Sequence, residues 1–249
     1  MSAVVRAIDL GRMSYADAYA RQVAEHEEVL AAREAGDVDP GRILLVEHAP
    51  PVITVSRRQG ARAHLVATPE VLAREGVVVE ETDRGGDITY HGPGQIVAYP
   101  ILDLNLYHLG LHAYMRLLEQ SVIDTLGAFG IAGERDPGAT GVWVGNSASR
   151  PPGIEASGEA RKIAAMGVRV RRWVSMHGLA LNVSTRLDHF RLIVPCGLVG
   201  RSVTSMENEL GGECPSMDRA KGVLVGALRG RLAAARAGAF ESAGPERSV

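Results

Sequence analysis

The chain has 249 residues, of which 46% are hydrophobic and 22% are charged, and its formal net charge is −2. This length and apolar content suit one large domain or two small ones with a substantial core. The near-neutral charge argues against a general nucleic-acid binder. No apolar run of about 18 residues is present, so no membrane span is expected, and the N-terminal segment lacks the apolar core of a signal peptide.

The first half of the chain alternates between expected helices and short strands. Ser14 is a suitable N-cap for a helix over 14–35, in which Ala, Glu and Arg dominate. The apolar run at 43–55 predicts two short strands, because Pro50 and Pro51 interrupt it. The elements expected next are a helix over 68–76 and strands over 76–81 and 96–104.

The second half is expected to begin with a helix over 111–129 and a brief strand over 141–145. Residues 146–159 are small, polar and interrupted by Gly and Pro, which predicts a mobile loop. Residues 162–184 alternate between apolar and other side chains, which predicts a β-hairpin. A helix over 216–236 and a frayed tail over 237–249 complete the expected elements.

These elements do not follow a strict βαβ repeat. No internal repeat and no Pro/Ser-rich linker divides the chain. The expected fold class is therefore α/β (α+β), with a single domain over residues 1–236.

The glycine-rich stretch RGGDITYHGPGQ (84–95) lies between two expected strands. It matches neither the dinucleotide-binding GxGxxG motif, because no helix follows it, nor the P-loop, because GK[ST] is absent. Such a stretch is either a plain turn or a surface where backbone closely approaches a ligand. Gly85 and Gly86 would let a thin, partly apolar ligand such as an acyl chain lie against the main chain.

Two cysteines, Cys196 and Cys214, are present. They are too few for a disulfide scaffold, and neither belongs to a zinc-binding CxxC pair, so free thiols, no metal and a cytoplasmic location are predicted. Both lie on Gly/Pro bends, and local pattern does not decide whether either is a nucleophile or a packed thiol. A nucleophilic thiol needs a nearby cation or base to lower its pKa, for which His91, His177 and Lys162 are candidates.

Three segments together carry a family resemblance. They are RGGDITYHGPGQIVAYPILDL (84–104), RKIAAMGVRVRRWVSMHGLALNV (161–183) and IVPCGL followed by RSVTSMENEL (193–210), and GVWV (141–144) agrees with them. In this order and spacing they closely resemble the octanoyltransferase family of lipoate biosynthesis. The resemblance covers most of the chain, from about Ile43 to Leu210. It implies the fold of biotin- and lipoate-protein ligases, a mixed β-sheet flanked by helices with the site over the sheet.

The resemblance also implies roles for individual residues. Cys196 corresponds to the nucleophile, and Lys162 corresponds to the lysine that lowers its pKa and moves protons. His177 and Asn182 are further candidates for support of the site, and whether His91 or His177 transfers protons or only shapes the pocket stays open. The implied substrate-binding residues are Arg84, Gly85, Gly86, Asp87, Ile88, Thr89, Tyr90, His91, Ala165, Met166, Gly167, Gly178, Leu179 and Ala180.

The implied reaction transfers an octanoyl group from octanoyl-acyl carrier protein to a lysine ε-amine on a lipoyl domain, through a thioester on Cys196. The implied acceptors are lipoyl domains of 2-oxoacid dehydrogenase acyltransferase subunits and the glycine cleavage H protein. The energy resides in the donor thioester, so no cofactor, ATP or metal is expected, and neither is a nucleic-acid or membrane partner.

Three finer expectations follow. The loop over 146–159 adjoins Lys162 and is expected to cover the site. Met166 and Met176 are expected to broaden the preference for acyl chain length, because methionine adapts to varied shapes. Exposed arginines are expected to dock acidic partners, namely Arg57, Arg58, Arg169, Arg171 and Arg172.

Three alternatives remain. An ATP-dependent lipoate- or biotin-protein ligase on the same fold would need no cysteine nucleophile. A thioesterase would use water as the acceptor. A catalytically inactive binding scaffold would not need both Cys196 and Lys162.

Overall fold

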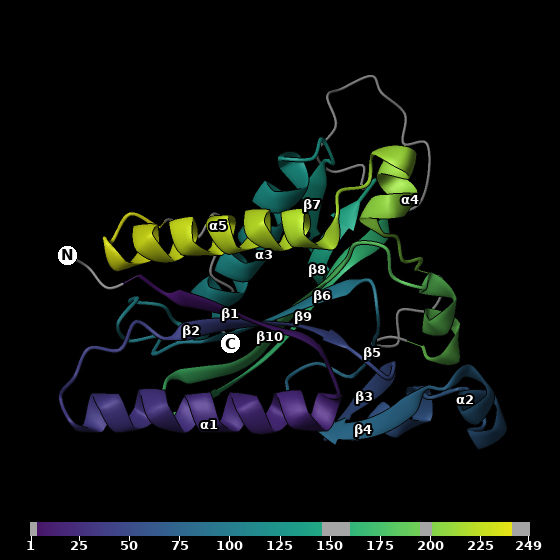
Figure 1. Cartoon of the computed structure of the whole chain (residues 1–249), viewed down its shortest axis with the longest axis horizontal. Coiled ribbons are helices and arrows are strands. Elements are labelled where there is room, and N and C mark those ends of the chain that lie inside the picture. The colour runs from purple at the N-terminus through teal and green to yellow at the C-terminus, as the bar shows by residue number, and fades with distance from the viewer. Residues whose placement is uncertain (1–3, 146–159, 195–200, 241–249) are drawn as a thin grey trace.

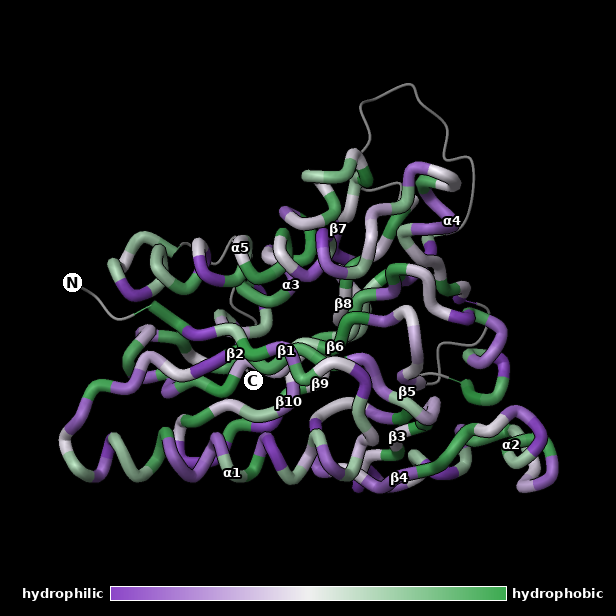
Figure 2. The backbone as a smooth tube through the Cα atoms, viewed as in Figure 1, coloured by the Kyte–Doolittle hydropathy of each residue, from purple (hydrophilic) through white to green (hydrophobic). Residues whose placement is uncertain are grey.

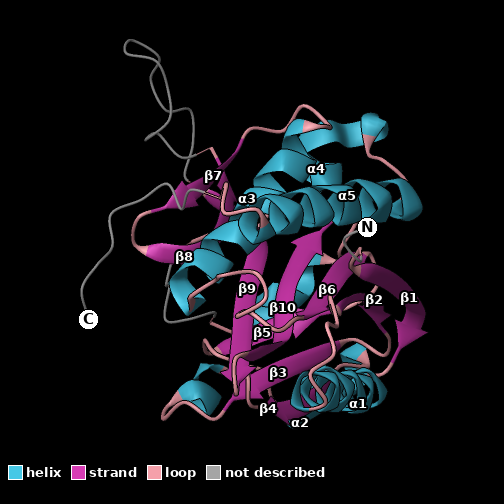
Figure 3. Ribbon diagram, turned by 90° about the vertical axis from the view of Figure 1, so that its left-hand side faces the viewer, coloured by secondary structure: helices cyan, strands magenta, loops and turns pink. Residues whose placement is uncertain are grey.

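The computed structural model describes residues 4–145, 160–194 and 201–240 (Figure 1). Cys196, the predicted loop over 146–159 and the end of the predicted tail lie outside these residues. Two mixed sheets form the framework, and Figure 3 shows their strands between the helices. The larger sheet has the order β1 (Arg6–Met13), β2 (Arg42–His48), β6 (Gln95–Ile101), β10 (Val174–Asn182), β9 (Arg161–Arg171), β8 (Ala139–Val144) and β7 (Gly133–Asp136). The smaller has the order β4 (Val78–Thr82), β3 (Val52–Ser56) and β5 (Ile88–His91).

Helices cover both faces of the larger sheet. Helices α3 (Leu111–Gly127) and α5 (Met217–Arg236) lie on one face and α1 (Tyr15–Glu34) lies on the other (Figures 1 and 3). In Figure 2 the middle strands are largely hydrophobic, whereas α1 alternates between hydrophilic and hydrophobic residues along its turns. The core therefore divides into a cluster under α3 and α5, a cluster under α1, and a third within the smaller sheet. No helix in the described ranges is long and apolar enough to cross a membrane.

The predicted helices are confirmed, and their caps explain their bounds. The Ser14 side chain accepts a hydrogen bond from the Asp17 backbone N–H at the start of α1. The Thr68 side chain accepts one from the Val71 backbone N–H at the start of α2 (Pro69–Glu75), and Gly76 ends α2 in the left-handed conformation. These side chains and this glycine satisfy polar groups that a helix end leaves unpaired. A short helix, α4 (Met206–Leu210), was not predicted.

The glycine-rich stretch contains a strand that was not predicted. Ile88–His91 form strand β5, which pairs antiparallel with β3. Ile88 and Tyr90 are buried, whereas Thr89 between them is only half-buried. Four residues between glycines are too few for this alternation to be recognised in the sequence. Strands β1 and β7 were missed for a related reason, since both are largely exposed or half-buried edge strands.

Candidate active site

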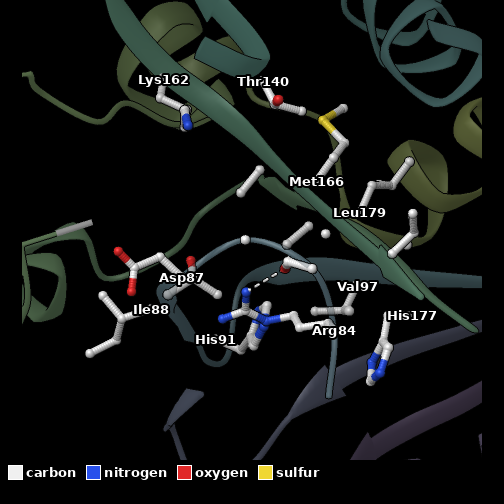
Figure 4. Close-up of a pocket in the computed structure, with 18 of the residues that line it drawn as sticks. Arg84, Asp87, Ile88, His91, Val97, Thr140, Lys162, Met166, His177 and Leu179 are labelled. Atoms are coloured by element: carbon white, nitrogen blue, oxygen red, sulfur yellow. Dashed lines mark hydrogen bonds between the residues drawn. The ribbon is translucent and has the colours of Figure 1, made fainter. Parts of the chain in front are cut away.

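A cavity of about 610 Å³ lies where the two sheets meet. Its lining comes from β5 and the turn before it, from β6, β9 and β10, and from the start of α3. Figure 4 shows Lys162 and Asp87 on one side of the view and His177 on the other. Much of the lining is apolar, including Val97, Met166 and Leu179. The volume falls within the usual range for small-ligand sites.

The β9–β10 hairpin places two of the predicted segments directly opposite each other. In the register of the pair, Ala165 faces Ala180, Met166 faces Leu179 and Gly167 faces Gly178. Strand β6 continues the surface, with Ala98 beside Leu179. A Cβ on Gly178 would lie 2.3 Å from the Ala98 carbonyl oxygen, so the close approach of β10 to β6 requires glycine.

Gly85 brings two backbones together rather than only exposing backbone to a ligand. Its N–H donates a 2.9 Å hydrogen bond to the Val168 carbonyl oxygen. A Cβ would lie 3.0 Å from that oxygen at Gly85 and 2.8 Å from the Gly85 carbonyl oxygen at Gly167. Both glycines therefore let the turn before β5 lie against β9, which closes one wall of the cavity.

The guanidinium of Arg84 is fixed by the smaller sheet. Nη2 donates to the Thr54 carbonyl oxygen at 2.8 Å and to Thr54 Oγ1 at 2.9 Å, and Nη1 donates to the Gly85 carbonyl oxygen at 3.0 Å. These hydrogen bonds hold the positively charged side chain of Arg84 in one position in the cavity wall.

The histidines of the cavity belong to a buried polar network. His91 Nδ1 lies 2.8 Å from Gln95 Oε1, and Gln95 Nε2 donates to Asn182 Oδ1 at 2.9 Å. His177 Nε2 lies 2.8 Å from Asp83 Oδ1. Burial lowers the pKa of His91 well below its ordinary value, and the nearby His48 adds to that effect. Burial also lowers the pKa of His177, against the opposing effect of Asp83.

These neutral histidines are suited to shape and orient the site. A proton donor near neutral pH needs a pKa near that pH, and burial moves both pKa values away from it. Proton transfer by Lys162 stays the prediction for this cavity.

Lys162 lies near the start of β9, as predicted, and also lines the cavity. Its Nζ lies 4.7 Å from the centroid of the Trp143 ring. Gly141, with φ of +123°, passes beside it, and a Cβ there would lie 3.2 Å from Lys162 Cε. The buried Glu119 accepts a hydrogen bond from the Gly141 N–H at 3.1 Å, which ties strand β8 to α3. The lysine side chain thus runs through a slot that glycine keeps open.

The Lys162 backbone pairs with the described chain that follows residues 195–200. Its N–H donates to the Ser202 carbonyl oxygen at 2.9 Å, and its carbonyl oxygen accepts from the Thr204 N–H at 2.9 Å. On the other side, the Val194 N–H donates to the His64 carbonyl oxygen at 2.8 Å. The described residues on both sides of 195–200 are therefore held by hydrogen bonds, Ser202 and Thr204 to Lys162 and Val194 to His64.

All but one of the predicted residues within the described ranges line this cavity. The exception is Tyr90, whose hydroxyl lies 3.0 Å from His189 Nδ1 and whose ring packs against Phe190 in the cluster of the smaller sheet. Sequence reasoning missed other lining residues because they lie outside the three family segments or gave no local signal. Among these are Tyr15, Arg58, Gln95, Val97, Tyr99, Leu111, Met115, Thr140 and Phe190.

Three other predictions change. Met176 packs in the cluster under α1 and does not line the cavity, so of the two predicted methionines only Met166 is placed to affect the fit of an acyl chain. Arg169 pairs with Asp83 and Arg172 pairs with Glu34, which reduces their value for docking.

Cys214 does not line the cavity, and burial raises the pKa of its thiol. A raised pKa disfavours the thiolate that a nucleophile needs.

The architecture first defines the class of protein. A bi-partite lipoate protein ligase from Thermoplasma acidophilum has TM-score 0.64 at 16% identity, over 90% of this chain and 82% of that chain. Lipoate-protein ligase A bound with ATP has TM-score 0.63 at 14% identity, over 90% and 84%. Biotin protein ligase from Aquifex aeolicus with biotin and ATP has TM-score 0.51 at 13% identity, over 93% and 72%. The predicted fold of biotin- and lipoate-protein ligases is confirmed.

Sequence comparison then narrows the class. The family model for the lipoyl protein ligase A/B catalytic domain matches residues 18–229. An octanoyltransferase of Parabacteroides distasonis is 44% identical over 82% of this chain and 87% of its own length. One of Solibacter usitatus is 49% identical over 79% of this chain and 80% of its own length. The chain belongs to the octanoyltransferase family.

Proposed function

We propose that the protein transfers an octanoyl group from octanoyl-acyl carrier protein to the ε-amine of a lysine on a lipoyl domain. The observation that carries the proposal is that Lys162 lines the same cavity as the two β-strand segments expected to contact the acyl chain. The octanoyltransferases among the relatives support the same reaction. The lipoate-ligase fold supports a lipoyl-domain acceptor.

In the proposed first half-reaction, neutral Lys162 takes the proton from the Cys196 thiol. The thiolate attacks the octanoyl thioester, and the protonated Lys162 returns its proton to the departing thiolate of the donor. An octanoyl thioester on Cys196 remains. Lowering the barrier by splitting one transfer into two is the usual gain of a covalent intermediate.

In the proposed second half-reaction, the acceptor amine attacks this thioester. Lys162 moves the proton from the attacking nitrogen to the Cys196 sulfur as the C–S bond breaks. The apolar lining from Val97, Met166 and Leu179 holds the alkyl chain. Because Met166 is flexible, neighbouring chain lengths should also be accepted.

Intact-protein mass spectrometry tests the proposal. Brief incubation with octanoyl-acyl carrier protein, without ATP or acceptor, should add one octanoyl group at Cys196. Addition of a lipoyl domain should move it to a lysine of that domain. Modification that requires ATP and free octanoate would instead identify a ligase, and rapid loss of the adduct to water would identify a thioesterase.

Variants assign the roles. Cys196→Ser should abolish transfer, and Lys162→Ala should slow it by about 10²–10⁴-fold, the usual scale for a positioned proton carrier. Cys214→Ser is the matched control and should transfer normally, since Cys214 lies away from the cavity. A Cys214→Ser protein without activity would mean that the nucleophile was misassigned.

A further inference from the structure

Asp87 lines the cavity, and one of its carboxylate oxygens has no hydrogen-bond partner among the described residues. The residue is 3% exposed and lines the cavity at the turn before β5. Its Oδ2 lies 2.7 Å from His64 Nδ1, an ion-pair distance when the imidazole is protonated. Among the described residues, none donates a hydrogen bond to Oδ1, which is fully buried. Buried carboxylate oxygens are normally paired, so an unpaired one at a cavity wall indicates a missing donor.

The pair lies next to the described residues that precede the segment with the proposed nucleophile. His64 ends the short helix η1 (Ala61–His64), and its carbonyl oxygen accepts the Val194 N–H. Leu65 and Ile193 form a β-bridge at the same place. In Figure 4, Asp87 lies on the same side of the view as Lys162 and opposite His177. Asp87 therefore lies beside the described residues that lead into the segment of Cys196.

The charges of the lining suggest what the missing donor is. The cations Arg58, Arg84 and Lys162 line the cavity, and Asp87 is the one acidic residue among the described lining residues. A carboxylate pairs best with a charged N–H donor. The acceptor of the reaction is a lysine ε-ammonium, which brings such a donor to the thioester.

We propose that Asp87 Oδ1 receives the ε-ammonium of the acceptor lysine, and that His64 passes the proton released from it to water. The proposal rests on the acyl-enzyme of the proposed function. The His64 side chain is 34% exposed and contacts the other carboxylate oxygen, so it connects Asp87 to solvent.

The proton balance of aminolysis requires such an exit. An octanoyl thioester and a lysine ammonium give an amide, a thiol and one proton. The first proton leaves the ammonium, through Asp87 and His64 to water, and frees the nitrogen lone pair. That lone pair forms the C–N bond, the C–S electron pair returns to sulfur, and Lys162 carries the second nitrogen proton to the thiolate.

The test measures the two half-reactions separately and compares two nucleophiles in the second one, a lipoyl domain and hydroxylamine. The rate of octanoyl-enzyme formation is measured first. The isolated octanoyl-enzyme is then mixed either with a lipoyl domain or with hydroxylamine, a nucleophile that is uncharged at neutral pH and needs no carboxylate to bind it. Asp87→Asn should slow transfer to the lipoyl domain at least tenfold more than it slows acylation or hydroxylamine cleavage. Tenfold is the lower scale for loss of a hydrogen bond to a charged group.

Further variants keep the test decisive. Asp87→Glu should recover part of the transfer to the lipoyl domain, because it keeps the charge. His64→Gln should slow that transfer less than Asp87→Asn does. Asp188→Asn, which removes an exposed carboxylate outside the cavity lining, is the control and should transfer normally.

Equal slowing of acylation, hydroxylamine cleavage and lysine transfer in Asp87→Asn would overturn the proposal, because Asp87 would then bind the donor or support the fold. Failure of the unaltered protein to form an octanoyl-enzyme would instead overturn the proposed function.

Discussion

Replacing Gly141 by alanine should displace the side chain of Lys162. Gly141 has φ of +123°, and a Cβ would lie 2.6 Å from the Ala164 carbonyl oxygen and 3.2 Å from Lys162 Cε. A non-glycine residue in such a region costs about 1–3 kcal/mol. Because the backbone oxygen cannot yield easily, the free energy of unfolding should fall by at least about 2 kcal/mol. Lys162 Cε must move by a few tenths of an ångström, so acyl-enzyme formation should slow measurably, but by less than the roughly 10²-fold that a misplacement of about 1 Å costs.

Urea unfolding and the rate of octanoyl-enzyme formation check both parts. Gly138→Ala, in the turn before β8, is the stability control, because its Cβ would meet nothing closer than Asp136 Oδ1 at 3.4 Å. Its free energy of unfolding should change by less than about 0.5 kcal/mol. A Gly141→Ala protein with normal stability and a normal acylation rate would refute the argument that this glycine keeps the slot for Lys162 open.

Burial lowers the pKa of His48 to about 4, below the ordinary value in the unfolded chain, so stability should fall as pH drops from about 6.5 to 4. The free energy of unfolding should fall by roughly 3 kcal/mol over this range. His48→Gln should flatten this part of the pH dependence of stability, measured by urea unfolding. An unchanged pH dependence in that variant would contradict the prediction. Gly226 is an exposed glycine in α5 with no atom within 4 Å of an added Cβ. Gly226→Ala should therefore raise the free energy of unfolding by about 0.5–1 kcal/mol. A thermal melt that shows destabilisation would refute this prediction. Arg57 and Arg171 are exposed, so reversing both charges to Glu should raise the KM for acyl carrier protein several-fold at low salt, with the effect fading at high salt. Arg191→Glu, which reverses an exposed arginine that pairs with Asp188, is the control. A KM unchanged by the double reversal would remove the docking hypothesis.

Local signals predicted most of the regular structure. Ser14, Thr68 and Gly76 bound helices in the expected way, and the alternation in 162–184 gave the β9–β10 hairpin. Such signals act within a few residues, so no tertiary information is needed to recognise them. Strand β5 was missed because a four-residue strand is defined by its partner β3 rather than by its own pattern.

Local sequence patterns did not predict which individual residues line the cavity. The sequence grouped Ile88 and Tyr90 together, yet Ile88 lines the cavity and Tyr90 packs with His189 and Phe190. It also treated Met166 and Met176 alike, although only Met166 lines the cavity. Which part of a cavity a strand residue reaches depends on the elements packed against it, and these come from distant parts of the chain.

The sequence by itself determined the family, the order of the main elements and the residue types from which the site is built. These depend on local propensity and on motifs that are contiguous along the chain. Only the tertiary structure decided which residues share the cavity: it placed Lys162 beside Trp143, and Asp87 against His64 with one oxygen unpaired among the described residues. Such contacts join residues far apart in sequence, and they arise from strand register and sheet packing, which no local pattern encodes.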